Sequence, residues 1–301
     1  MDSFKRRLLT EPKGNQKLEK TQKLTGVAVY SLSLAPASSS GVANLCKWAS
    51  EACIAHCVGA EHNGLSQPFA SIFRARIAKT EWLVNQPTEF RSRLVRELEL
   101  ASRRHARLGE KVAFRLNCFS DLPWIQDPLV RPTLETLYHQ YGAVSYDYTA
   151  APSRYRGWLA ERPAWYHMTL SRKEHTPIKL VRDIVNLGGN VAVVFRSPAP
   201  RGAVWQGMPV IDGDASDLRY TDRPGTIVAL KAKGSARQSD GGFVVDHPWG
   251  TSPALRDRSG TVRAIQARRE REAYDRRCAA RSVWESRSEM LPSTMALLRS
   301  M

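Results

Sequence analysis

The sequence lacks the patterns that mark membrane proteins, secreted proteins and the common hydrolases. No apolar run approaches the ~20 residues that a membrane-spanning helix needs, and the lysine-rich residues 1–23 contain no apolar stretch typical of a secretory signal. The motifs G-x-S-x-G, P-loop and H-E-x-x-H are absent. We therefore expect a cytoplasmic protein without membrane association, and none of the chemistries that those motifs serve.

Acidic residues are scarce relative to basic ones. The chain has 29 Asp and Glu against 45 Lys and Arg, which gives a formal net charge of +16 and a pI of about 10.0. Such a charge favours a polyanionic partner, for example nucleic acid bound through a basic arm and tail. A generally basic surface with no specific partner explains the charge equally well. The composition does not indicate the oligomeric state.

Strand-like and helix-like segments alternate over residues 25–250. The strands are expected at 27–34, 112–119, 143–148, 165–170, 191–195, 226–232 and 243–246, and the helices at 69–83, 88–108, 129–141, 153–160 and 177–188. Strands that alternate with helices pair in parallel. We therefore predict an α/β fold, a complete or partial (β/α) barrel over 25–250. A flexible basic arm over 1–24 precedes it, and an Arg-rich helical tail over 251–301 follows it.

Cysteine is used sparingly, with five residues in the chain, but three of them cluster in twelve residues after the first expected strand. In a reducing cytoplasm, clustered cysteines indicate metal binding or catalysis more than disulfides. Cys46, Cys53 and Cys57 could take three corners of an iron–sulfur cluster and leave one iron open. They could also bind zinc, with His56 or His62 completing the site, or be plain buried thiols. Iron–sulfur is the interpretation we favour.

Polar residues also follow several expected strands, where a (β/α) barrel carries its functional groups. These residues are Asn117, Asp121, Asp147, Tyr148, Asp212, Asp214, Asp217, Lys231 and Lys233. Carboxylates there could hold a ribose hydroxyl or an ammonium group, and lysines could neutralise a carboxylate or phosphate. The three aspartates at 212–217 surround a glycine, so they fit turn formation as well as an Mg²⁺ site. His167 lies inside an apolar strand and is expected to be a core residue.

Several longer stretches resemble one phage family, gene product 88. They are LSLAP at 32–36, CKWAS at 46–50, Cys53 with Cys57, RLN at 115–117, SDLPW at 120–124, YDYT at 146–149, YHMTLS at 166–171, GD at 213–214 with DLR at 217–219, and KAKG at 231–234. The resemblance implies a phage-encoded protein in the host cytoplasm, and it implies no particular activity. It also leads us to expect glycine at position 118 and lysine at position 150, where this chain has Cys118 and Ala150.

The layout is similar, more distantly, to radical S-adenosylmethionine (SAM) enzymes. That resemblance implies a [4Fe–4S] cluster on Cys46, Cys53 and Cys57, SAM at the open iron, and the SAM amino group near residues 117–121, which include Ser120. The cysteine spacing of that superfamily is x3 then x2, whereas here it is x6 then x3. This resemblance and the strand-end positions together give the predicted cofactor-binding residues, which are Asn117, Ser120, Asp121, Asp147, Tyr148, Lys231 and Lys233. The alternative is a non-enzymatic, nucleic-acid-binding phage protein with structural cysteines or zinc.

Overall fold

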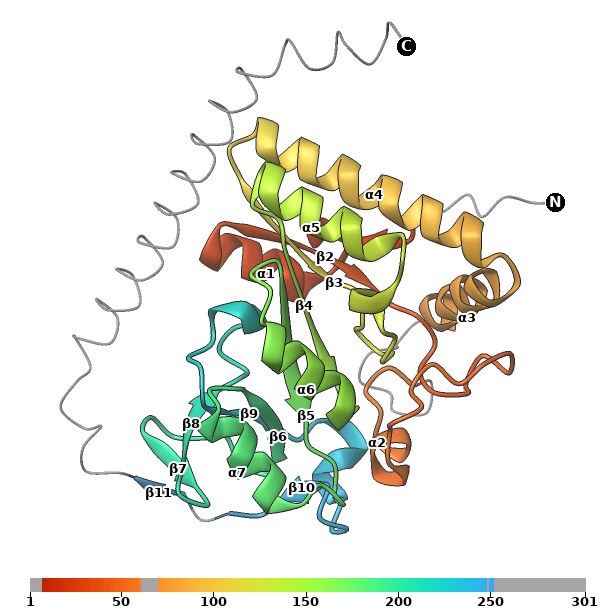
Figure 1. Ribbon diagram of the computed structural model, residues 1–301. Helices are drawn as coiled ribbons and strands as arrows, with labels where there is room; N and C mark the ends of the chain where they lie inside the picture. The colour runs from red at the N-terminus through yellow and green to blue at the C-terminus, as the bar shows by residue number, and fades with distance from the viewer. Residues whose placement is uncertain (1–6, 61–69, 248, 252–301) are drawn as a thin grey trace, which may run out of the picture. The chain divides into compact units, whose positions relative to one another are not determined.

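The computed structural model describes residues 7–60, 70–247 and 249–251 of the chain (Figure 1). The chain divides into two units, Met1–Ser252 and Pro253–Met301, and every described residue belongs to the first. The helix expected in the Arg-rich tail therefore lies outside the described residues. Within them, no helix combines the length and apolar character needed to cross a lipid bilayer.

An open, mostly parallel sheet forms the centre of the first unit. Its parallel strands lie in the order β2 (Val27–Leu32), β3 (Lys111–Arg115), β4 (Val144–Thr149), β5 (Tyr166–Ser171), β6 (Val191–Phe195), β9 (Ile227–Lys231) and β8 (Met208–Asp212). Further strands add to it: β1 (Leu9–Thr10) and β7 (Ala203–Trp205) pair antiparallel with β2 and β8, β11 (Gly250–Thr251) pairs with β7, and β10 (Val244–Val245) runs parallel to β6. The expected mixed α/β class is confirmed. In the described residues the sheet ends at β1 and β11 without closing, so the expected barrel is not confirmed.

Helices connect the parallel strands close to the expected positions. They are α3 (Ala70–Asn85), α4 (Pro87–Arg107), α5 (Val130–Tyr141), α6 (Pro152–Glu161) and α7 (Ile178–Asn186). In α4, Phe90, Leu94 and Leu98 recur at helical spacing and are fully buried, each contributing about 1.5–3 kcal/mol by burial. Figure 1 shows α4 and α5 lying together over the strands at the β2 end of the sheet. Their apolar faces and one face of β2, β3 and β5 form the main core.

The N-terminal segment corrects one prediction. Residues 1–24 were expected to form a flexible arm, but β1 pairs with β2, and α1 (Gln16–Thr25) packs against β2. Leu8 is fully buried, and its carbonyl accepts a hydrogen bond from Lys79 Nζ at 2.7 Å. The lysines of this segment dominate its composition, whereas a few leucines decide its packing. The arm prediction is therefore wrong over residues 8–24, and residues 1–6 lie outside the described part of the chain.

Candidate functional site

The cysteine segment lies after β2, at the carboxyl end of the parallel strands. Cys53 belongs to α2 (Glu51–Ala55), and Cys46 and Cys57 flank this helix in irregular backbone. The Ser50 side chain caps α2 by accepting from the Cys53 amide at 3.2 Å. Glu174, after β5, accepts from Ser50 Oγ at 2.5 Å and from the Ala52 amide at 3.3 Å. The segment is thus fastened to a loop more than a hundred residues away in sequence.

Each of the three thiols is half-buried and has its own polar neighbours. Cys46 Sγ accepts from the Ala37 amide at 3.4 Å and donates to the Phe119 carbonyl at 3.3 Å. Burial raises the pKa of Cys46 to about 11, and the charges of Cys57 and Cys53 add to this increase. Burial also raises the pKa of Cys57, while hydrogen bonds from the backbone of Gly59 and Ala60 favour its thiolate. The three sulfur atoms therefore lie within electrostatic reach of one another.

The three thiols do not, however, converge on a single point. Across the described part of the chain, no set of three His, Cys, Asp or Glu side chains is placed to hold a metal ion. The predicted common metal site is therefore not supported by the side-chain positions. His56 Nδ1 lies 3.0 Å from Ser235 Oγ, and His62 is outside the described residues.

Lys173, Arg76 and Cys118 lie beside the three predicted cysteines, and no sequence pattern linked them to this segment. Lys173 Nζ lies 3.1 Å from Cys53 Sγ. Arg76 of α3 is 7% exposed and donates to the Gly59 carbonyl at 2.7 Å. Burial lowers the pKa of Arg76, whereas the charges of Cys118 and Cys57 raise it, so both thiols lie near this guanidinium. Only the fold brings α3 and the β5–α7 loop to the cysteine segment.

Asn117, Ser120 and Asp147, three of the predicted cofactor-binding residues, lie together in one buried network. Asp147 is 1% exposed and accepts from the Asn117 amide at 2.7 Å, from Asn117 Nδ2 at 3.2 Å and from Tyr166 OH at 2.5 Å. Asn117 Oδ1 in turn accepts from Ser120 Oγ and from the Leu122 amide, both at 2.9 Å. Burial raises the pKa of Asp147 to about 7, against the effect of these hydrogen bonds. The network shapes the loop after β3.

The other predicted cofactor-binding residues divide among three places. Asp121 pairs with Arg154 Nη1 at 2.5 Å and accepts from the Ala150 amide at 2.9 Å, so it is tied to the start of α6. Lys231 and Lys233 both contact Asp214, through the Lys231 amide at 2.7 Å and Lys233 Nζ at 2.6 Å. The amide of Asp214 also donates to Asp212 Oδ1 at 2.9 Å, which supports the turn interpretation of these aspartates. Tyr148 is half-buried, with its ring 5.0 Å from the Arg115 guanidinium.

The chain can now be compared with known proteins. The profile of the family described as gene product 88 matches residues 6–247. The chain belongs to the gene product 88 family. No curated protein and no solved structure matches it. The family match covers the sheet except β11, together with the cysteine segment and the Asp147 network. The radical SAM-like layout is not confirmed.

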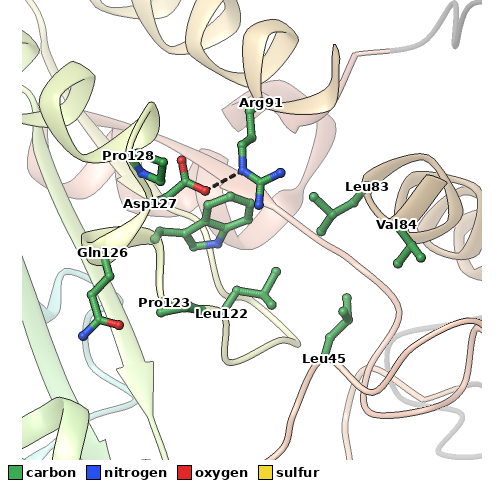
Figure 2. Close-up of a pocket in the computed structure, with 10 residues that line it drawn as sticks. Leu45, Leu83, Val84, Arg91, Leu122, Pro123, Gln126, Asp127 and Pro128 are labelled. Atoms are coloured by element: carbon green, nitrogen blue, oxygen red, sulfur yellow. Dashed lines mark hydrogen bonds and ion pairs between the residues drawn. The ribbon is translucent and has the colours of Figure 1, made fainter. Parts of the chain in front are cut away.

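This gene product 88 protein also has an apolar groove beside its cysteine segment. The groove has a volume of about 360 Å³ and begins at Leu45, next to Cys46. Figure 2 shows Leu83 and Val84 on one side and Leu122 and Pro123 on another, with Asp127 reaching Arg91. Arg91 Nε lies 2.5 Å from Asp127 Oδ2, which fixes the rim. The cysteine segment is therefore bordered by packed apolar side chains on this side.

Proposed function

We propose that this gene product 88 protein binds an iron–sulfur cluster through Cys46, Cys53 and Cys57. The observation that carries the proposal is the gathering of three half-buried thiols from one short segment, within electrostatic reach of one another, at the carboxyl end of a parallel sheet. All three proposed ligands are cysteine thiols, and such soft sulfur ligands select iron–sulfur clusters, zinc and cuprous copper over harder ions. Reduced thiols of this kind agree with the proposed cytoplasmic location.

The surroundings of the thiols support thiolate ligands. A metal-bound cysteine must lose its proton, and nearby cations and N–H donors stabilise the resulting charge. Lys173 lies beside Cys53, the backbone of Gly59 and Ala60 faces Cys57, and the Ala37 amide faces Cys46. Each proposed ligand thus has a donor that compensates a negative sulfur.

In this proposal, the three sulfurs converge through a rearrangement of residues 46–57. The helix α2 spans five residues, and Cys46 and Cys57 lie in the irregular backbone on its two sides. Metal binding commonly orders its ligand segment, because the binding free energy becomes folding free energy. We therefore assign the cluster to the bound form of residues 46–57. SAM at the open iron is the further step of the proposal, with Asn117, Ser120 and Asp121 in the loop after β3 as the residues proposed to contact it.

Metal analysis of protein purified without oxygen tests the proposal. After reconstitution with ferrous iron and sulfide, we expect about four irons per chain and a thiolate-to-iron absorption near ~400 nm. Cys46→Ser, Cys53→Ser and Cys57→Ser should each lose most of this iron, whereas Cys278→Ser, a matched control outside the segment, should retain it. A colourless, iron-free wild-type protein would refute the cluster. One zinc per chain would favour the structural alternative. Titration of the reconstituted protein with SAM should change the electron paramagnetic resonance spectrum of the reduced cluster.

Nucleic-acid binding is the second candidate, and the net charge of +16 favours it. On α4, Arg96, Arg103 and Arg107 are exposed, so part of the basic surface belongs to the described fold. Binding of single- or double-stranded DNA should weaken steeply with salt, because phosphate contacts release counterions. A joint Arg96→Gln, Arg103→Gln and Arg107→Gln variant should bind more weakly than the wild type. Equal affinities would exclude α4 as the binding surface.

A further inference from the structure

A polar row crosses the face of the sheet that α1 covers. On this face Val27, Val29, Ala113 and Tyr146 pack with Leu18 of α1 and with Leu218. The polar row lies nearer the carboxyl ends of the strands on this face. In it, Ser31 is paired with Arg115, and Tyr146 is paired with His167. Phe114 is paired with Ser145, so Arg115 follows beside Tyr146. Parallel strands covered on both faces are normally apolar throughout, so this row departs from what the fold alone requires.

Two polar atoms of this row are buried without a partner. Among the described residues, neither the hydroxyl of Tyr146 nor Nε of Arg115 makes a hydrogen bond, and Tyr146 is 0% exposed. Leaving a buried donor unpaired costs about 1–3 kcal/mol, and native proteins retain few such groups. Here two of them lie on neighbouring strands of the same face. Tyr148, one pleat further along β4, presents its ring 5.0 Å from the same guanidinium.

The segment 213–222, between β8 and β9, places a negative charge near Arg115, Tyr146 and Tyr148. Burial works to lower the pKa of Arg115, but electrostatic interactions with Cys118, Tyr148, Tyr146 and Asp217 raise it overall. The charge of Asp217 also acts on Tyr146 and on Tyr148. Asp217 of the covering segment therefore lies within electrostatic reach of Arg115, Tyr146 and Tyr148.

The covering segment is fastened on both sides of Asp217. Arg219 donates through its guanidinium to the carbonyls of Gly213 and Ser216, and its Nη1 lies 3.1 Å from Asp222 Oδ2. Leu218 is 3% exposed and packs into the small core beneath α1. The backbone around Asp217 is therefore held in place.

We propose that Arg115, Tyr146 and Tyr148 bind the phosphate or carboxylate group of a small ligand, which displaces the Asp217 carboxylate. A guanidinium and two phenol hydroxyls are all donors, and charge-assisted hydrogen bonds from such groups are the strong ones. An anion with several acceptor oxygens satisfies the unpaired Arg115 Nε and Tyr146 hydroxyl together, which a single aspartate does not. The site uses no cysteine, so it stands without the iron–sulfur proposal.

Binding of inorganic phosphate and of acetate, measured by isothermal titration calorimetry at constant ionic strength, tests this site. Arg115→Met should weaken the binding of the better probe at least tenfold, and Tyr146→Phe should weaken it several-fold. Asp217→Asn should tighten it several-fold, because it removes the competing charge. Tighter binding by Asp217→Asn also excludes misfolding as the explanation, since a poorly folded variant does not bind more tightly. Iron content should be the same in all variants, so this result is separate from the cluster.

A matched control separates the site from general attraction to a basic protein. Lys179 has an 85% exposed side chain on α7, and Lys179→Met removes one positive charge outside the row. Its affinity for the probe should equal that of the wild type. Equal losses in Lys179→Met and Arg115→Met would overturn the proposal. So would an Asp217→Asn variant that binds no more tightly than the wild type, or a wild type that binds neither probe.

Discussion

Lys173 Nζ and Cys53 Sγ lie 3.1 Å apart, although 120 positions separate the two residues in the sequence. Lys173 also donates to Ser171 Oγ at 3.0 Å, which keeps its ammonium group beside the sulfur. A cation at this distance stabilises a thiolate. The loop after β5 therefore contributes directly to the chemistry of a cysteine from the segment after β2.

Removal of that cation should make Cys53 less reactive. In cluster-free protein, Lys173→Met should slow alkylation of Cys53 by iodoacetamide several-fold near neutral pH, because the thiolate is the nucleophile. Mass spectrometry of the peptide that contains Cys53 measures the rate. Lys179→Met is the matched control, since Lys179 is exposed and pairs with Asp183 on α7. A rate for Lys173→Met equal to that of the control would show that the contact does not influence the thiol.

Asp147 should make the protein less stable as the pH rises. Its pKa is raised from 3.8 to about 7, mainly by burial, so between these values the folded state retains a proton that the unfolded state has lost. The free energy of unfolding should therefore fall as the pH increases through this window. Asp222, with a pKa raised to about 6 by burial, acts in the same direction. The contribution of Asp147 to this pH dependence is therefore measured by comparing the wild type with a variant that lacks the carboxyl group.

Urea denaturation of the wild type and of Asp147→Asn between pH 4.5 and 7.5 makes this comparison. The wild type should lose about 1–3 kcal/mol more stability than Asp147→Asn across this range. Tyr166→Phe keeps the carboxyl but removes a hydrogen bond that lowers its pKa. Its pH dependence should therefore extend to higher pH. Parallel curves for the wild type and Asp147→Asn would contradict the assignment.

Much of the fold follows from local sequence patterns. β-branched runs such as the one that forms β6 predict their strands, because five consecutive apolar residues, four of them buried, leave few alternatives. The hairpin between β7 and β8 was not expected, although Gln206 and Gly207 both take positive φ angles of 51° and 78° there, as a type I′ turn requires. Gln-Gly is a weak signal for that turn, and the short strands around it show no clear alternation.

The candidate site was only partly predictable, for a different reason. Clustering along the chain pointed to Cys46, Cys53 and Cys57, but the cations beside them come from distant elements. Arg76 looks like one of many surface arginines until α3 packs its guanidinium 4.1 Å from the Phe119 ring. Such contacts depend on tertiary packing, which one sequence does not encode in any local pattern.

Gly59 should be essential to the packing of the cysteine segment on the loop after β3. A Cβ atom at position 59 would lie 2.4 Å from Phe119 Cδ1. Gly59→Ala should therefore destabilise the protein by about 1–3 kcal/mol, the usual cost of overpacking. Gly157→Ala is the control, because a Cβ there meets open space within α6 and should stabilise the helix by up to about 1 kcal/mol. Thermal and urea unfolding measure both effects, and Phe119→Ala, which removes Cγ and Cδ1, should partly rescue Gly59→Ala.

Cluster binding should order the cysteine segment more than any other part of the fold. If the three sulfurs converge on iron, the backbone of residues 46–57 becomes fixed at three points, and its local opening becomes rarer. Hydrogen exchange followed by mass spectrometry should then show slower exchange in this segment after reconstitution, with little change in the strands β4 and β6. Cys53→Ser should remove most of the added protection. Added protection that survives in Cys53→Ser would mean that iron binds elsewhere, and the thiols would then be ordinary packing residues.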